Sequence, residues 1–228
     1  MTFSSISNYY PLDIITLPFQ NKEKKAVLIK KVVKPKFETV DILESTGFYF
    51  SKEQYLLAKF ISNYYFCSLG ESFSLFVPFF EGKTVVEDEK TVKCSIVLSD
   101  KQNTVLVELQ KHKVSLLFGD TGSGKTEIYM KWFEEVLAEG KRVLMLMPEI
   151  SLTPQMQDRL EEHFGDSVVM WHSKLSKKQK EKALEKLLDG SARVIAGARS
   201  ALFLPISNLG LIVVDEEHDD SYKANSRP

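Results

Sequence analysis

Cysteine is scarce in this sequence of 228 residues, which contains only Cys67 and Cys94. Two cysteines so far apart exclude a disulfide framework and also a zinc site built from closely spaced cysteine pairs. The sequence also lacks an apolar run of membrane-spanning length, and its N-terminus has no signal-peptide pattern. These absences predict a cytoplasmic protein with no membrane contact and no zinc site in this region.

An excess of charge of either sign is missing as well, because 30 lysines and arginines face 31 acidic residues. The resulting net charge of −1 creates no global field that would attract nucleic acid, so any such contact must come from local clusters. A hydrophobic content of 43% and a charged content of 27% are typical of a globular protein. The length suits one large domain or two small ones.

The most informative stretch is residues 114–130, VSLLFGDTGSGKTEIYM. It predicts a short strand, a loop of the pattern Gly-x-x-x-x-Gly-Lys-Thr and a helix over residues 127–139. The glycines let the loop backbone turn its N–H groups toward phosphate oxygens, while Lys125 reaches the outer phosphates and Thr126 ligates Mg²⁺. The alternative is a glycine-rich turn that only joins a strand to a helix. We expect ATP and Mg²⁺ to bind to Gly119, Asp120, Thr121, Gly122, Ser123, Gly124, Lys125 and Thr126.

Strand and helix patterns alternate after this loop, which predicts a parallel sheet with crossover helices. The expected strands cover residues 143–147, 167–171, 193–196 and 211–214, and the expected helices begin at Pro154 and after Ser176. Residues 211–214 are continuously apolar, as in a central strand covered on both faces.

An acidic sequence follows this last strand, Asp215-Glu216-Glu217-His218. A carboxylate at the end of a strand beside a phosphate loop is placed to hold Mg²⁺. We assign this role to Asp215 and the polarisation of the attacking water to Glu216. The alternative is a strand end followed by a solvated acidic turn.

Residues 1–80 have a different pattern and predict a small β-rich domain, joined by a polar linker over residues 81–97 to a second domain over residues 98–228. Two strands are expected at residues 13–19 and 25–33, followed by a helix that begins after Ser51 and an extended stretch over residues 72–80. Lysines gather around the first two strands, and they either protect a hairpin edge or contact phosphates. The cluster comprises Lys22, Lys24, Lys25, Lys30, Lys31, Lys34 and Lys36.

Five sequence blocks resemble the primosomal protein N′ (PriA) family of superfamily-2 helicases. They are residues 120–129, 147–155, 172–173, 197–205 and 214–223. The resemblance implies an α/β fold with a RecA-like P-loop NTPase lobe, preceded by a β-rich DNA-binding domain similar to the family's 3′-end-binding domain. The implied activity is an ATP-dependent 3′→5′ DNA helicase that acts at stalled forks and assembles the primosome.

The resemblance also implies roles for single residues. Gln102 matches a glutamine that reads adenine, although Ser99 and Gln102 also form a capping box that would start a helix. His218 matches a residue that couples the nucleotide across the cleft, with an ordinary surface histidine as the alternative. Thr153, Arg199 and Ser200 lie in segments that track single-stranded DNA, whereas a purely structural role would make these loops helix caps. Among the basic residues of the N-terminal domain, Lys22, Lys24 and Lys25 are the candidates for DNA contact.

The implied protein is longer than this sequence, since the second helicase lobe, its arginine finger and a zinc-binding insert would follow Pro228. The expected partners are forked and single-stranded DNA, primosome proteins and single-strand-binding proteins. Two alternatives remain open. One is a nucleotide- and DNA-binding fragment without turnover, because hydrolysis of ATP loses about 10³–10⁵ in rate without the arginine. The other is a different superfamily-2 translocase.

Overall fold

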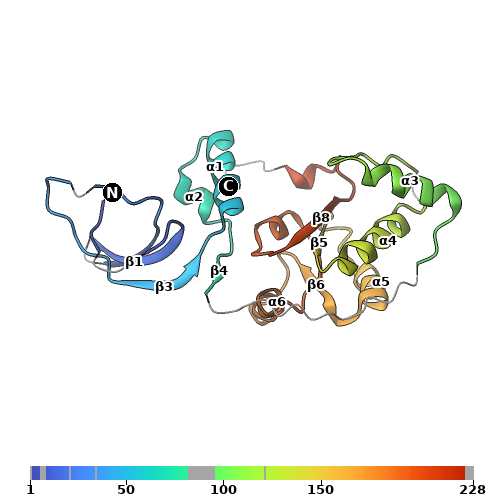
Figure 1. The fold of residues 1–228 in the computed structure, drawn as a ribbon. Coiled ribbons are helices and arrows are strands. Elements are labelled where there is room, and N and C mark those ends of the chain that lie inside the picture. Colours follow the sequence, from blue (N-terminus) through green and yellow to red (C-terminus); the bar gives the residue numbers. More distant parts are fainter. Residues whose placement is uncertain are drawn as a thin grey trace. The chain divides into compact units, whose positions relative to one another are not determined.

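The computed structural model describes residues 2–5, 9–20, 22–33, 35–81, 96–120 and 122–223 (Figure 1). Contacts between Cα atoms divide these residues into two compact units, which are described separately below. The N-terminal unit contains residues up to 81 together with 203–205, and the second unit contains the rest from residue 96 to 223. Most of the predicted linker, residues 82–95, lies outside the described residues.

The N-terminal unit is built on an antiparallel sheet with the strand order β2-β1-β3-β4. Its strands are β1 (Asp13–Phe19), β2 (Lys22–Val27), β3 (Glu44–Tyr49) and β4 (Phe79–Phe80). The first strand agrees with the prediction, but the second was predicted to begin three residues too late and to continue to residue 33. It begins at Lys22 because this residue pairs with Phe19, and it ends at Val27, which pairs with Ile14.

Two helices pack against this sheet, and their starts are set by capping boxes. The helix α1 (Lys52–Tyr65) begins after Ser51, as predicted. The helix α2 (Leu69–Phe73) takes up residues 72 and 73 of the stretch that was predicted to be extended, so the prediction was wrong there, whereas Phe79–Phe80 of the same stretch form β4. The reason is local, because Ser68 accepts a hydrogen bond from the Glu71 N–H and the Glu71 carboxylate accepts one from the Ser68 N–H. The apolar faces meet in a core that contains Ile14, Phe50, Ala58, Ile61, Phe73 and Phe76.

The second unit is an α/β structure around a four-stranded parallel sheet with the strand order β6-β7-β5-β8. This is the fold class that the sequence predicts. The helices α5 and α6 are crossover elements between its strands, and α4, which precedes β5, also packs against the sheet (Figure 1). The elements in chain order are α3 (Asp100–Gln110), α4 (Lys125–Ala138), β5 (Arg142–Leu146), α5 (Pro154–Phe164), η1 (Gly165–Ser167), β6 (Val168–Trp171), α6 (Lys177–Asp189), β7 (Val194–Gly197), η2 (Arg199–Phe203), β8 (Leu209–Val214) and η3 (Asp220–Tyr222).

The edge of this sheet differs from the prediction at two places. Residues 114–118 form no strand, and Val114 and Phe118 are 88% and 92% exposed. β8 is an edge strand and not a central one, and its Ile212 is also exposed. Both differences have one cause, since an apolar run becomes a strand only when a neighbouring strand takes up its backbone hydrogen bonds. In the described part of the chain β8 pairs with β5 alone.

The core of the second unit lies between α4, α5 and the sheet. Phe133, Met145, Met147, Leu160 and Val194 are fully buried there. α4 approaches β8 so closely that a Cβ atom on Gly210 would lie 2.7 Å from a methyl group of Val136. This packing sets the start of α4, and with it the glycine-rich loop, relative to the ends of β5 and β8.

Candidate nucleotide-binding site

The glycine-rich loop leads directly into α4, and Gly124 is the residue that caps this helix. Gly124 has a φ of +83°, a conformation that favours glycine, and it offers no side-chain oxygen to the first turn. The N–H groups of that turn therefore remain available to an anion, and the helix dipole adds partial positive charge. Gly119 is required for a different reason, since a Cβ atom there would lie 2.8 Å from the Ser123 hydroxyl.

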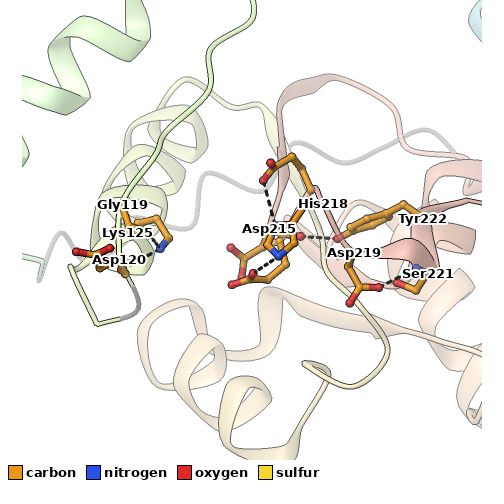
Figure 2. Close-up of polar contacts among 10 residues, drawn as sticks. Gly119, Asp120, Lys125, Asp215, His218, Asp219, Ser221 and Tyr222 are labelled. Atoms are coloured by element: carbon orange, nitrogen blue, oxygen red, sulfur yellow. Dashed lines mark hydrogen bonds and ion pairs between the residues drawn. The ribbon is translucent and has the colours of Figure 1, made fainter.

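Lys125 is held by the loop that precedes it. Its Nζ donates hydrogen bonds to the carbonyls of Gly119, at 2.6 Å, and Asp120, at 3.0 Å (Figure 2). The ammonium group thus lies inside the curl of the loop, where the sequence places phosphate oxygens. Of the predicted phosphate-binding residues, Thr121 lies outside the described residues.

Gln102 contacts both the start of its own helix and the glycine-rich loop. Its side-chain oxygen accepts a hydrogen bond from the Ser99 N–H at 2.9 Å, which completes the predicted capping box of α3. Its side-chain nitrogen lies 3.4 Å from the carbonyl of Gly124, as the donor of a long hydrogen bond. The same amide therefore links α3 to the loop.

Asp215 follows β8, and its backbone is bonded on both sides. Its N–H donates to the carbonyl of Leu146, the last residue of β5, at 2.8 Å, and its carbonyl accepts from the Tyr222 hydroxyl at 2.7 Å (Figure 2). Glu216 has a φ of +49°, which is uncommon for a residue other than glycine and turns the chain sharply. His218 lies 3.5 Å from a carboxylate oxygen of Glu216.

The charges of the two segments act on each other. Burial raises the pKa of Asp215, the negative charge of Glu216 raises it further, and Lys125 is among the groups that lower it. Burial and the charges of Asp215 and Glu216 also raise the pKa of Tyr129, on α4, to about 12. The acidic segment after β8 therefore faces the start of α4, as a site shared by phosphate and a cation requires.

The donor set suits Mg²⁺ held together with phosphate. The Thr126 hydroxyl and the Asp215 carboxylate are hard oxygen ligands, and Mg²⁺ usually takes one or two protein ligands beside phosphates and water. No group of three or more potential metal ligands occurs in the described ranges, so these residues offer no closed, all-protein metal cage. An open site of this kind fits a cation that arrives with a nucleotide.

Three of the residues predicted to contact DNA follow strands of the parallel sheet at the same edge as Asp215. Thr153 caps α5, where its hydroxyl accepts a hydrogen bond from the Met156 N–H at 3.3 Å. Arg199 and Ser200 begin η2 just after β7, and both are exposed. Since β7 and β5 are neighbours in a parallel sheet, both loops leave from adjacent strand ends. The structure confirms the capping role of Thr153, whose N–H also donates to the Ser151 carbonyl at 2.9 Å, and it leaves the Arg199 side chain exposed.

The N-terminal unit contains the lysine cluster and a cavity of about 1470 Å³. Lys22, Lys24 and Lys25 are exposed on β2, an edge strand, and the Nζ of Lys24 lies 4.6 Å from the centre of the Phe19 ring. Lys24 and Lys25 line the cavity together with Lys30 and Lys31. Lys22 does not line the cavity, so the hollowed surface contains two of the three candidate lysines.

A glycine-rich loop before a helix, facing an acidic strand end of a parallel sheet, defines an α/β protein of the nucleotide-binding P-loop class. The chain belongs to the DEAD/DEAH box helicase family, whose model matches residues 99–227. Over all of its 228 residues it is 46% identical to the replication restart protein PriA of Helicobacter pylori, and it covers 36% of that protein.

Two further relatives carry the same name. The chain is 38% identical over 219 residues to the replication restart protein PriA of Rickettsia conorii. This match covers 92% of this chain and 34% of the relative. It is 50% identical over 122 residues to the replication restart protein PriA of Bacillus subtilis. This match covers 54% of this chain and 15% of the relative. The chain thus spans about a third of the length of the first of these relatives. No helix in the described ranges is both long and apolar enough to cross a membrane.

Sequence reasoning assigned no role to three residues that the structure places at the site. Tyr222 bonds to Asp215, and Arg159 of α5 forms an ion pair with Glu127 in the first turn of α4. Tyr222 lies in one of the blocks that resemble the PriA family. The sequence therefore marked this position, but it indicated no role for the side chain. The pair of Glu127 and Arg159 has no local signal, because its partners lie 32 positions apart.

Proposed function

We propose that this chain is part of an ATP-dependent 3′→5′ DNA helicase that reloads the replication machinery at stalled forks. The observation that carries this proposal is the glycine-rich loop at the start of α4, with Lys125 inside its curl, in the same α/β unit as Asp215 at the end of β8. In the proposal these two segments form the two halves of a nucleotide site in a chain of the DEAD/DEAH box helicase family. The similarity to replication restart proteins supports the cellular role.

In the proposed site, Lys125 and the loop amides bind the phosphates of ATP. Thr126 and Asp215 hold Mg²⁺, which neutralises charge on the transferred phosphoryl group. Glu216 orients the attacking water, and His218 couples the site to the rest of the motor through its contact with Glu216. Gln102 reads the adenine by exchanging its long bond to Gly124 for the edge of the base.

DNA follows the carboxyl edge of the sheet in this proposal. Thr153, Arg199 and Ser200 donate to phosphates of a single strand, because hydroxyl and cationic side chains near strand ends suit sequence-independent contacts. The N-terminal unit adds a second DNA contact through Lys24 and Lys25 at its cavity and Lys22 on the same strand. Its similarity to a domain that binds a 3′ end makes a strand terminus the proposed ligand.

The wider proposal places the protein in the cytoplasm with forked DNA, primosome proteins and single-strand-binding proteins as partners. The proposal includes a second lobe with an arginine finger and a zinc-binding insert, which would lie in the part of the longer relatives that this chain does not match. These features are implied by the similarity and are not carried by the described residues.

The test measures ATP hydrolysis by the longest natural form of the protein, with and without a forked DNA. We expect stimulation by the fork, and unwinding of partial duplexes with a 3′ single-stranded tail but not of those with a 5′ tail. Lys125→Ala should abolish nucleotide binding and turnover, whereas Lys141→Ala, which removes a lysine paired with the exposed Glu139, should preserve both. Unchanged ATP binding by Lys125→Ala would refute the site, and unwinding from a 5′ tail would refute the direction.

A second candidate function is nucleotide and DNA binding without turnover by residues 1–228 alone. The chain covers only about a third of the length of the first relatives that it matches, and this favours the second candidate. Comparison of this piece with the longest natural form decides between the two, since equal turnover by both would show that the described residues suffice for catalysis.

A further inference from the structure

Tyr222 closes the loop that carries the acidic residues of the site. The loop begins at Asp215, directly after β8, and Tyr222 ends η3. The Tyr222 hydroxyl donates to the carbonyl of Asp215 at 2.7 Å, so that the eighth residue of the loop is bonded to the first (Figure 2).

The bond holds one particular peptide group, which joins Asp215 to Glu216. The oxygen of this group accepts from Tyr222, and its N–H belongs to Glu216. Because a peptide group is planar, its oxygen and its N–H rotate together. Loss of the bond at the oxygen therefore frees the rotation of the peptide group that directly follows the Asp215 side chain.

The rest of the loop depends on the same closure. Glu216 adopts a φ of +49°, which costs free energy for a side chain of its kind and persists only where the surroundings enforce it. The Asp219 N–H donates to the Glu216 carbonyl at 2.9 Å, and the Asp219 carboxylate accepts from the Ser221 N–H at 2.7 Å. These bonds lead the chain back to Tyr222, whose ring then reaches Asp215.

The environment keeps the Tyr222 hydroxyl a donor. Burial raises the pKa of this phenol above its ordinary value, and the charges of Asp215 and Asp219 raise it further. The hydroxyl therefore carries its proton throughout the physiological range, and an acceptor such as a carbonyl suits it.

We propose that Tyr222 is a positioning residue, which sets the Asp215 carboxylate for its cation through the peptide group between Asp215 and Glu216. This inference rests on the proposed function of Asp215 as a ligand of nucleotide-bound Mg²⁺. Tyr222 itself touches neither substrate nor cation, and it acts through the backbone of the acidic loop.

The test compares Tyr222→Phe with Tyr129→Phe. Both changes remove one hydroxyl whose surroundings include the charges of Asp215 and Glu216, but the Tyr129 hydroxyl makes no hydrogen bond to any described residue. In the longest natural form of the protein, we expect Tyr222→Phe to raise the half-saturating Mg²⁺ concentration of ATP hydrolysis and to lower kcat, each by about threefold to tenfold, the loss expected for one hydrogen bond. KM for ATP should change less than twofold. Tyr129→Phe should leave all three values within twofold of wild type.

A second measurement needs no turnover. In nucleotide-free protein, amide hydrogen exchange over residues 215–223 should accelerate in Tyr222→Phe, because the Asp219 and Ser221 amides lose their fixed loop. Exchange over β5 should stay unchanged, which excludes global unfolding as the cause.

Wild-type Mg²⁺ dependence together with wild-type exchange in Tyr222→Phe would overturn the positioning role and leave the proposed function intact. Faster exchange without a change in Mg²⁺ dependence would also overturn it, since the loop would then not set the metal ligand. Absence of Mg²⁺-dependent turnover in the wild-type protein would instead refute the proposed function itself.

Discussion

The side-chain nitrogen of Gln102 lies 3.4 Å from the carbonyl of Gly124, which joins the start of α3 to the loop before α4. The approach is close, since a Cβ atom on residue 124 would lie 2.3 Å from that nitrogen and would displace the Gln102 side chain. The position that resembles an adenine-reading glutamine is thus in direct contact with the proposed phosphate-binding loop. Both polar atoms of the Gln102 amide make contacts, because its nitrogen approaches Gly124 and its oxygen caps α3.

The first prediction concerns the base specificity of this amide. Gln102→Ala should weaken ATP binding more than GTP binding, and the preference for ATP should fall about tenfold, the effect of one or two hydrogen bonds to a base edge. Titration of fluorescent derivatives of both nucleotides measures this ratio. Ser99→Ala is the matched control, because it removes the other half of the capping box and should affect both nucleotides equally. An equal loss of both nucleotides in Gln102→Ala would leave Gln102 a purely structural cap.

The second prediction concerns the lysine cluster on β2. Replacement of Lys22, Lys24 and Lys25 by glutamine should weaken DNA binding and reduce the slope of log K against log salt by about 0.7 for each phosphate of a single strand that the lysines no longer neutralise. The measurement is a salt titration of DNA affinity by fluorescence anisotropy. The control replaces three exposed lysines near α3 in the second unit, Lys101, Lys111 and Lys113. If the slope keeps its wild-type value, the lysines serve only to protect a strand edge.

The third prediction concerns the buried ion pair between Lys131 and Glu134. The Glu134 side chain is fully buried, lies 2.9 Å from the Lys131 nitrogen and also accepts a hydrogen bond from the Ile96 N–H. Lys131→Met should cost about 3 kcal/mol of unfolding free energy, because it removes one partner of a buried pair. The double change of Lys131→Met and Glu134→Leu should cost less than this single change.

Urea unfolding of the single and double variants gives the coupling energy of this pair. Lys111→Met serves as the control, since Lys111 and its partner Glu108 are both about 60% exposed and such pairs contribute about 1 kcal/mol or less. Additive effects of Lys131→Met and Glu134→Leu would contradict a coupled pair.

The fourth prediction concerns pH and the first turn of α1. The backbone N–H of Glu53 and the Ser51 hydroxyl lower the pKa of the Glu53 carboxyl from its ordinary value of 4.5. A lowered folded-state pKa stabilises the folded state at neutral pH, and the stabilisation disappears as the pH falls below about 4.5. Glu53→Gln should therefore cost a few tenths of a kcal/mol at pH 7, reduced by solvent exposure, and nothing in acid.

Denaturant unfolding of the wild type and Glu53→Gln between pH 3 and pH 8 measures this difference. Glu23→Gln, on the edge strand β2 and outside any helix, provides the comparison. A pH-independent difference for Glu53→Gln would show that packing and not charge is responsible.

The sequence by itself determined the features that depend on neighbouring residues. The helices after Ser51, Ser99 and Ser176 begin where their capping boxes predict, because both partners of each box lie within four positions. The glycine-rich loop before α4 is likewise local, since its conformation depends on residues without a Cβ atom. The alternation of strands and helices after residue 140 predicted the parallel sheet for the same reason.

Only the tertiary structure decided which strands pair and which side chains meet. The apolar residues 114–118 have the composition of a strand but no pairing partner among the described residues, and β8 is at the edge of the sheet. The bond between Tyr222 and Asp215 and the contact of Gln102 with Gly124 join segments that composition and spacing do not connect. Backbone pairing and side-chain contact between distant segments depend on how the whole chain packs, so no local pattern specifies them.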